Sequence, residues 1–251
     1  MKRSINSLLG FTIKGIDGEI GKVEEFYFDD RTSTIRYMVV KTGGWFSSKK
    51  VLISPEAFQE PEWDTKTFSV NLTKEKIRNS PDIDTDKPVS RQNEELTRGH
   101  YAWPSYYGGY GMYGHWGLGM WGYPAVDETR EEQEIQRIKA TEHTNENQHL
   151  RSTHEVTGYN IHATDGDIGE VDDFIIDEAT WKIHFLVVET GNWFSGKKVL
   201  ISPQWIGEVK WLERGITINQ TKNEVKDSPE YDSSQPVNDM YEHSLYDYYG
   251  R

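Results

Sequence analysis

The sequence contains no cysteine among its 251 residues. This absence excludes disulfide bonds, thiolate zinc sites and catalysis by a thiol. A run of about 20 apolar residues is also lacking, so no segment is predicted to span a membrane as a helix. The first residues, MKRSINSLLGFTIKG, hold too short an apolar stretch for a signal peptide. We therefore predict a cytoplasmic protein without a transmembrane segment.

Positive charge is scarce as well. Lys and Arg total 28 against 41 Asp and Glu, which gives a formal net charge of −13. Such a balance opposes the neutralisation of phosphates on which nucleic-acid binding depends, so no nucleic-acid partner is expected. The lysine pairs Lys49-Lys50 and Lys197-Lys198 stand beside predicted strands and are interpreted as solvated edges. Basic proteins are the more natural partners of an acidic chain.

A long internal repeat dominates the sequence. Residues 42–55 read TGGWFSSKKVLISP and residues 190–203 read TGNWFSGKKVLISP, an offset of 148. The same offset pairs Asp17-Gly18 with Asp165-Gly166 and Ser80-Pro81 with Ser228-Pro229, without a gap. Roughly two in five positions are identical over the aligned stretch, which indicates a duplicated domain. We predict domains at residues 5–92 and 153–240, a connector at 93–152 and an aromatic tail at 241–251.

Within each repeat the apolar residues have a period of two, which is typical of strands. Asp17-Gly18 predicts a hairpin with a type I′ turn, and Gly21 predicts a bulge or bend. The residues from Ile35 to Val40 are almost all apolar and predict a strand buried on both faces. Residues 51–53 and 68–70 predict two further strands.

A short helix is predicted after the last strand of each repeat. Thr73 and Thr221 are suited to cap its start, and Ser80-Pro81 and Ser228-Pro229 end it. The predicted fold is therefore mainly β, with two small β-barrels that are each closed by a short helix and joined by a connector rich in glycine and aromatic residues.

These elements resemble the PRC-barrel family, which is named for the cytoplasmic domain of the photosynthetic reaction-centre H subunit and includes the C-terminal domain of RimM. The resemblance is carried by the DG hairpins, the I-G-x-V strands at 20–23 and 168–171, the VLISP strands and the closing helices. It implies a binding or scaffolding module. Two alternatives that it implies are a peripheral accessory factor of a photosynthetic or electron-transfer membrane complex, and a ribosome-maturation factor.

Two aromatic residues follow the buried strand in each repeat, where loops usually carry polar residues. They are Trp45 and Phe46 in the first copy, and Trp193 and Phe194 in the second. One interpretation, the favoured one, is that these rings plug the open end of a barrel. The other is that they are exposed anchors for a protein partner, beside a lysine pair.

The connector holds a second set of aromatic residues. Residues 100–124 are biased to glycine, tyrosine and tryptophan, a composition that disfavours regular structure but is too adhesive for an inert linker. Packing on the barrels, self-association and binding of another protein are all open. The candidate binding residues here are Tyr106, Tyr107, Trp116 and Trp121.

Catalysis is not expected. The acidic residues gather at hairpin turns and at outward strand positions, which indicates a solvated face, and the EF-hand spacing is absent. No HExxH, Walker A or GxSxG pattern occurs. We therefore predict a non-enzymatic protein with no catalytic residues, no metal site and no cofactor.

Overall fold

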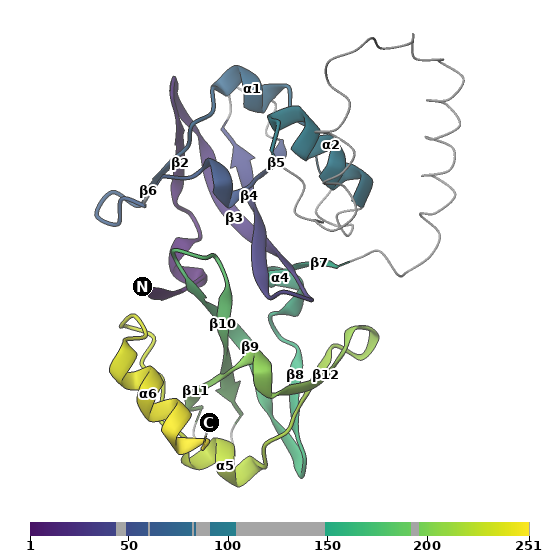
Figure 1. The fold of residues 1–251 in the computed structure, drawn as a ribbon, viewed down its shortest axis with the longest axis vertical. Helices are drawn as coiled ribbons and strands as arrows, with labels where there is room; N and C mark the ends of the chain where they lie inside the picture. Colours follow the sequence, from purple (N-terminus) through teal and green to yellow (C-terminus); the bar gives the residue numbers. More distant parts are fainter. Residues whose placement is uncertain are drawn as a thin grey trace, which may run out of the picture.

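The computed structural model describes residues 1–43, 49–59, 61–81, 83, 91–103, 149–191 and 196–250. These residues form a mainly β structure with two sheets and a few short helices. Figure 1 shows the half built from the first repeat above the half built from the second. The coarse fold prediction is confirmed, whereas closure of each sheet into a barrel stays a prediction.

The two sheets have the same order of strands. The first runs β5-β4-β3-β2-β6 and the second runs β11-β10-β9-β8-β13-β12. The last strand of the shared order, β6 or β13, lies parallel to β2 or β8, while the other neighbours are antiparallel. The bounds are β2 Thr12–Gly15, β3 Gly18–Asp29, β4 Thr34–Thr42, β5 Lys50–Ile53 and β6 Thr67–Ser69, then β8 Asn160–Ala163, β9 Gly166–Asp177, β10 Ile183–Thr190, β11 Lys198–Ile201, β12 Ile206–Lys210 and β13 Gly215–Ile218.

Both hairpins that the Asp-Gly pairs predict are present, but the turn type is wrong. Gly15 pairs with Gly18, so the two turn residues are Ile16 and Asp17. A type I′ turn needs positive φ at both central residues, whereas here only Gly18, at the start of β3, has a positive φ of 121°. The Asp17 carboxylate instead accepts a hydrogen bond of 2.8 Å from the backbone N–H of Lys74 at the start of a helix.

The glycine that follows each hairpin marks a bulge, as predicted. The register between β2 and β3 shifts beside Gly21, and that between β8 and β9 shifts beside Gly169. A Cβ atom at either glycine would lie 2.0 Å from a carbonyl oxygen of the next strand, that of Lys41 or Glu189. Only glycine permits the two backbones to approach so closely.

The helices lie at the edges and ends of the sheets. The first short helix has its predicted threonine cap, since Thr73 accepts from the N–H of Lys76, and Thr221 forms a full capping box with Glu224. The α-helices are α1 Lys74–Arg78, α2 Arg91–Tyr101, α4 Thr153–Val156, α5 Lys222–Asp227 and α6 Asp239–Tyr248, and the 3₁₀ turns are η1 Asn6–Leu8, η2 Pro55–Ala57, η5 Pro203–Trp205 and η6 Trp211–Glu213.

The repeated lysine pairs are not solvated edges, and this part of the sequence interpretation is wrong. The Lys49 ammonium donates to the carbonyls of Arg78 and Ser80 at 2.6 and 2.7 Å, at the C-terminal end of α1. Lys197 does the same at the end of α5, where it donates to the carbonyls of Lys226 and Ser228. A cation satisfies the unpaired carbonyls at a helix C-terminus. The second lysine of each pair reaches across one strand to an acid on the next, at 2.9 Å from Lys50 on β5 to Glu24 on β3 and 2.8 Å from Lys198 on β11 to Asp172 on β9.

The two halves exchange their first strands, a feature that the sequence did not predict. The strand β1, Lys2–Ser4, pairs with β9 of the second half, and β7, Leu150–Ser152, pairs with β3 of the first half. The offset between these strands is again 148, so the exchange is reciprocal. Figure 1 shows β7 entering beneath the first half and the N-terminus lying between the halves. One hydrophobic core accordingly runs through both halves.

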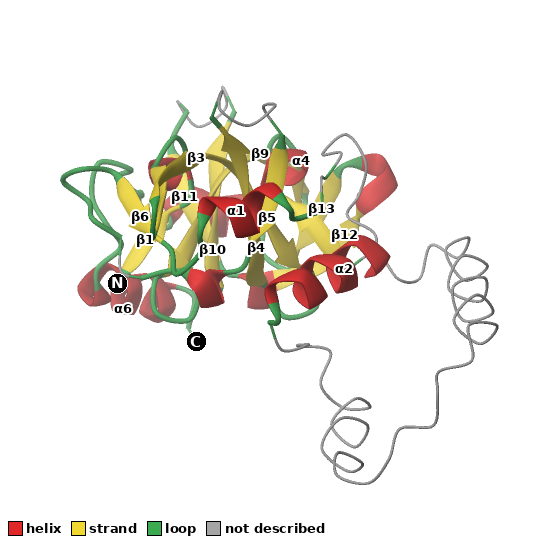
Figure 2. Ribbon diagram, turned by 90° about the horizontal axis from the view of Figure 1, so that it is seen from above, coloured by secondary structure: helices red, strands yellow, loops and turns green. Residues whose placement is uncertain are grey.

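Helices α2 and α6 are also equivalent at this offset, although the sequence prediction placed α2 in the connector and likened the C-terminal tail to residues 106–108. In Figure 2 both helices lie along the same side of the strands. Tyr246 and Tyr249 of the tail pack on Trp205, with ring centroids 5.9 and 4.3 Å apart. The tail is therefore a packed helix of the second half.

Candidate functional site

The predicted binding residues lie outside the described residues. This holds for Trp45 and Phe46 in the first loop, for Trp193 and Phe194 in the second, and for the connector residues Tyr106, Tyr107, Trp116 and Trp121. Their roles stay predictions. The structure does show how each aromatic loop is closed at its base, because Thr42 Oγ1 donates to the carbonyl of Lys49 at 3.0 Å and Thr190 Oγ1 donates to that of Lys197 at 2.7 Å.

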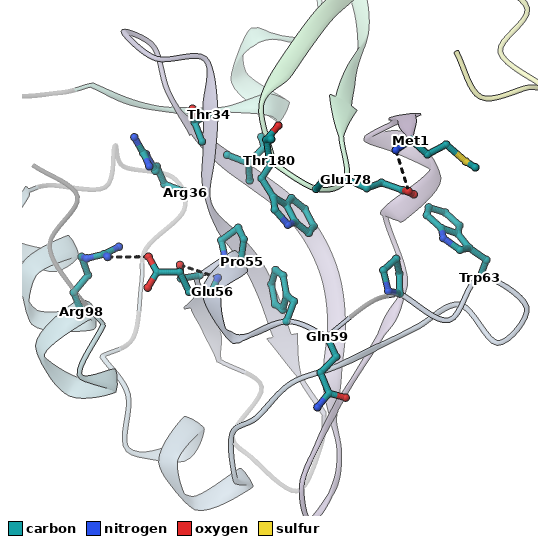
Figure 3. A pocket seen from close by; sticks show the side chains of 16 residues that line it. Met1, Thr34, Arg36, Pro55, Glu56, Gln59, Trp63, Arg98, Glu178 and Thr180 are labelled. Atoms are coloured by element: carbon teal, nitrogen blue, oxygen red, sulfur yellow. Dashed lines mark hydrogen bonds and ion pairs between the residues drawn. The ribbon is translucent and has the colours of Figure 1, made fainter. Parts of the chain in front are cut away.

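A cavity of about 750 Å³ lies where the first half meets the second. One wall comes from the start of β4 and from η2 with the residues after it, a second from α2, and a third from the β9–β10 turn of the other half. Figure 3 shows Arg98 and Trp63 at opposite ends of this cavity and Pro55, Glu56 and Gln59 between them. The site is thus elongated and depends on both halves.

Trp181 is the main contribution of the second half. It stands in the β9–β10 turn with a positive φ of 56°, and its backbone oxygen accepts a hydrogen bond of 2.8 Å from the N–H of Ile35. This bond fixes the turn on the edge of β4. The indole packs beside Phe58 and Phe68, with ring centroids 5.5 and 6.1 Å away. An apolar floor made of rings from both halves results, partly open to solvent.

Trp63 forms the far end of the cavity. The Arg3 guanidinium lies 3.8 Å from the centre of its ring, and this cation is attracted electrostatically to the ring face. Arg3 also forms an ion pair with Glu178 of the second half. The same residue therefore orients the aromatic end wall and joins the halves.

The other end of the cavity is held by a polar network in which Tyr37, Glu94 and Arg98 are buried and Glu56 is exposed. Arg98, on α2, pairs with Glu56 at 3.1 Å and donates to the Tyr37 hydroxyl at 3.3 Å. Tyr37 in turn donates to the Glu94 carboxylate at 2.9 Å. Burial and the charge of Glu94 raise the pKa of Tyr37, so that the phenol stays protonated and remains a donor. Burial alone would lower the pKa of Arg98. The interactions of the guanidinium with Tyr37 and Glu56 outweigh this effect of burial, so the pKa of Arg98 is raised.

Part of the predicted acidic face is structural rather than solvated. Asp173 is buried and accepts hydrogen bonds from Ser4 of the exchanged strand and from the backbone of Asn6, while burial raises its pKa. Glu25, its equivalent, accepts from Ser152. Asp29 is also buried, beside Arg36. Within the described residues, no three His, Asp or Glu side chains are grouped as metal ligands.

The cavity residues were missed because no local motif marks them. Trp181 replaces Ser33 of the first repeat, and Arg98 replaces Tyr246 of the second. A usable signal was nevertheless present, since a large residue at a position where its repeat partner is small indicates a role that only one half performs. No described helix is both long and apolar enough to cross a membrane.

These features define a protein of two homologous β domains that exchange strands and share a cleft. Comparison with protein families matches the PRC-barrel domain at residues 2–76 and again at residues 150–225. The chain belongs to the PRC-barrel domain family. An uncharacterized protein of Deinococcus radiodurans is 29% identical over 109 residues, which cover 41% of this chain and 39% of that protein.

Proposed function

We propose that the chain is a non-enzymatic protein-binding or scaffolding module built from two PRC barrels, and that the cleft between its halves receives an extended segment of a partner protein. The observation that carries this proposal is the elongated cavity of about 750 Å³ with aromatic rings from both halves. Aromatic side chains in a partly desolvated pocket are the residues that contribute most to protein–protein affinity.

The polar residues of the cleft support binding rather than chemistry. Arg98 and Glu56 neutralise one another, and Arg36 lies 3.8 Å from Asp29. Groups engaged in this way orient a ligand and shape the walls, whereas the rings of Phe58 and Trp181 supply apolar surface. A partner segment that places a large apolar side chain on these rings fits this distribution.

A site-specific photo-crosslinker tests the proposal. Gln59 is exposed at the rim of the cleft and takes the crosslinking residue, while Leu212, fully exposed in the second half, takes it in the control. In native lysate we expect position 59 to capture one protein through a single segment, and position 212 not to capture it. The Trp181→Ser variant, which copies Ser33 of the first repeat, should lose this crosslink while its circular dichroism spectrum is retained.

Other outcomes would contradict the proposal. A crosslink from position 59 only to this chain's own residues would mean that the protein occupies its own cleft. Equal capture from positions 59 and 212 would place the partner elsewhere. If Trp181→Ser unfolds the protein, Trp63→Ser removes the aromatic end wall instead, and an undiminished crosslink in that variant would exclude the cleft.

A further inference from the structure

The strand β12 ends the sheet of the second half. Among the described residues it pairs with β13 alone, so its outer edge faces no other described strand. Gly207 and Glu208 in this strand are exposed. Figure 1 shows the hairpin of β12 and β13 projecting from the second half on the side opposite to α6, and Figure 2 also shows β12 and α6 far apart. The outer edge of β12 is therefore within reach of a strand from another molecule.

The backbone of Val209 points towards this outer edge. A threonine hydroxyl of β13 donates to the carbonyl of Glu208 at 3.3 Å, so that carbonyl faces β13. In the first half, Glu62 stands at the position of Lys210 and exchanges backbone hydrogen bonds of 2.8 and 3.1 Å with Thr67. Successive residues of an antiparallel strand direct their backbone groups to alternate sides. The N–H and C=O of Val209, between two residues that face β13, thus face away from it.

The first half has a proline at the same position. Pro61 stands where the second half has Val209, and proline has no N–H to donate to an added strand. The sequence places Glu60 and Glu62 on either side of it, where the second half has an acid and a lysine. Two segments of this kind paired about Pro61 would set acids opposite acids. The repeats therefore differ in whether this edge favours the addition of a strand.

The strand β12 is complementary to itself in an antiparallel pair. A twofold axis at Val209 lets its N–H and C=O exchange two hydrogen bonds with the same groups of a second copy. This register sets each Glu208 opposite Lys210 of the second copy, and opposite charges across an antiparallel pair are favourable. An axis at Glu208 would instead set two carboxylates face to face. The register at Val209 both uses the outward backbone groups and pairs unlike charges.

The residues after the strand are compatible with this register. Lys210 lies 3.5 Å from Glu213 of its own chain, but both side chains are exposed, so this contact is weak. Leu212 is a large apolar residue that is fully exposed two positions beyond the strand. In the register at Val209 it would approach Ile206 of the second copy, which is itself partly exposed.

We propose that the outer edge of β12 is a self-association surface, at which two copies of the chain pair as antiparallel strands about a twofold axis at Val209. A contact between two strands of five residues is small, so the dimer forms reversibly. None of the residues of β12 lines the cleft between the halves, and the inference does not depend on the function proposed for that cleft.

Sedimentation equilibrium of the full chain over a dilution series tests the proposal, and we expect a reversible equilibrium of monomer and dimer. Val209→Pro copies the first half and should abolish the dimer with an unchanged circular dichroism spectrum, because the lost N–H faces away from β13. The matched control Pro61→Val makes the reverse change in the other half and should keep the parent equilibrium. A parent chain that is monomeric at every concentration would overturn the inference, as would a folded Val209→Pro variant that dimerises like the parent.

Two charge variants decide the question if Val209→Pro does not fold. Glu208→Lys and Lys210→Glu each set like charges opposite one another at both ends of the pair, and each alone should weaken the dimer by at least about tenfold. A mixture of the two variants brings unlike charges together again and should restore a mixed dimer. A mixture that associates no better than its components would overturn the register at Val209 and the inference with it.

A photo-crosslinking residue at position 212 identifies what lies on this edge. In purified protein it should join two copies of the chain and give a product of twice the mass. Crosslinks confined to a single chain would mean that the chain covers its own edge, and would overturn the inference. In lysate the same position should capture a second copy and not the partner of the cleft, so the two proposals fail separately.

Discussion

The two halves of this chain have the same sheet order and the same exchanged strand, yet their cores are completed differently. In the first half, helix α2 is held by a polar network of Tyr37, Glu94 and Arg98, and Trp181 enters from the other half. In the second half, helix α6 is held by aromatic packing of Tyr246 on Trp205 and Phe185. Duplication has kept the backbone scheme while the contents of each core have diverged, and the divergence coincides with the cleft.

The largest expected effect comes from the residue that fills the second core from within. Trp205 is 0% exposed and contacts Tyr246 and Tyr249, so Trp205→Ala should lower the free energy of unfolding by about 3–5 kcal/mol. Urea unfolding followed by circular dichroism measures the loss. Because Ala57 stands at the same position of the first half, a loss below about 1 kcal/mol would show that the two cores are built alike after all.

A similar or slightly smaller loss is expected when the polar network of the first half is broken. Arg98→Ala removes the cation beside the buried Tyr37–Glu94 pair and should cost about 3 kcal/mol, since the Glu94 carboxylate is left in a buried site without that charge; the exposed Glu56 contributes little. The control is Tyr37→Phe, which copies Phe185 of the second half and should cost only about 1 kcal/mol. Equal losses in the two variants would contradict a network centred on Arg98.

The smallest expected effect is a pH dependence confined to the second half, where His184 stands at the position of Arg36. Burial lowers the pKa of His184 and Lys2 lowers it further, against the raising influence of Glu242 and Asp177. Folding therefore favours the neutral imidazole, and the unfolded chain binds the proton more readily. Stability should fall as the pH is lowered through about 6.5, the ordinary histidine value, and become level below the folded pKa.

The comparison that isolates this effect is His184→Gln. When the pH is lowered from about 7.5 to about 5.5, the free energy of unfolding should fall in both proteins, but by a few tenths of a kcal/mol less in the variant. The difference is small because His184 is partly exposed. Thermal unfolding at both pH values gives the difference. Identical pH profiles for parent and variant would mean that the imidazole titrates equally in the folded and unfolded chain.

The local pattern of the sequence predicts most of the fold. Period-two apolar residues, the Asp-Gly pairs and the threonine caps give the strands, hairpins and short helices, because each depends on near neighbours. The exchange of β1 and β7 is not predictable in this way. These strands have three residues each, KRS and LRS, and hold a single apolar residue in total, so they show no alternation of apolar and polar residues. Lys49 and Lys197 were misjudged for a related reason, as their acceptors lie 29 and 31 residues further along the chain.

The candidate site was less predictable than the fold. Its walls come from η2, α2 and the turn after β9, and no spacing in the sequence indicates that Glu56, Arg98 and Trp181 meet. The predicted loop and connector aromatics, among them Trp45 and Trp116, stay candidates for a second contact with a partner. The sequence does contain one indication of the site, because equivalent positions of the repeat carry a small residue, Ser33, and a large one, Trp181.

The reciprocal strand exchange has a consequence for the order of events during synthesis. While the first half leaves the ribosome, the edge of β3 that β7 will cover has no strand to pair with, and its own β1 belongs to a domain that does not yet exist. At roughly 5–20 residues per second, the wait from residue 103 to residue 152 is a few seconds. An uncovered strand edge invites pairing with other chains, so a nascent chain stalled in the connector is the form most prone to aggregate.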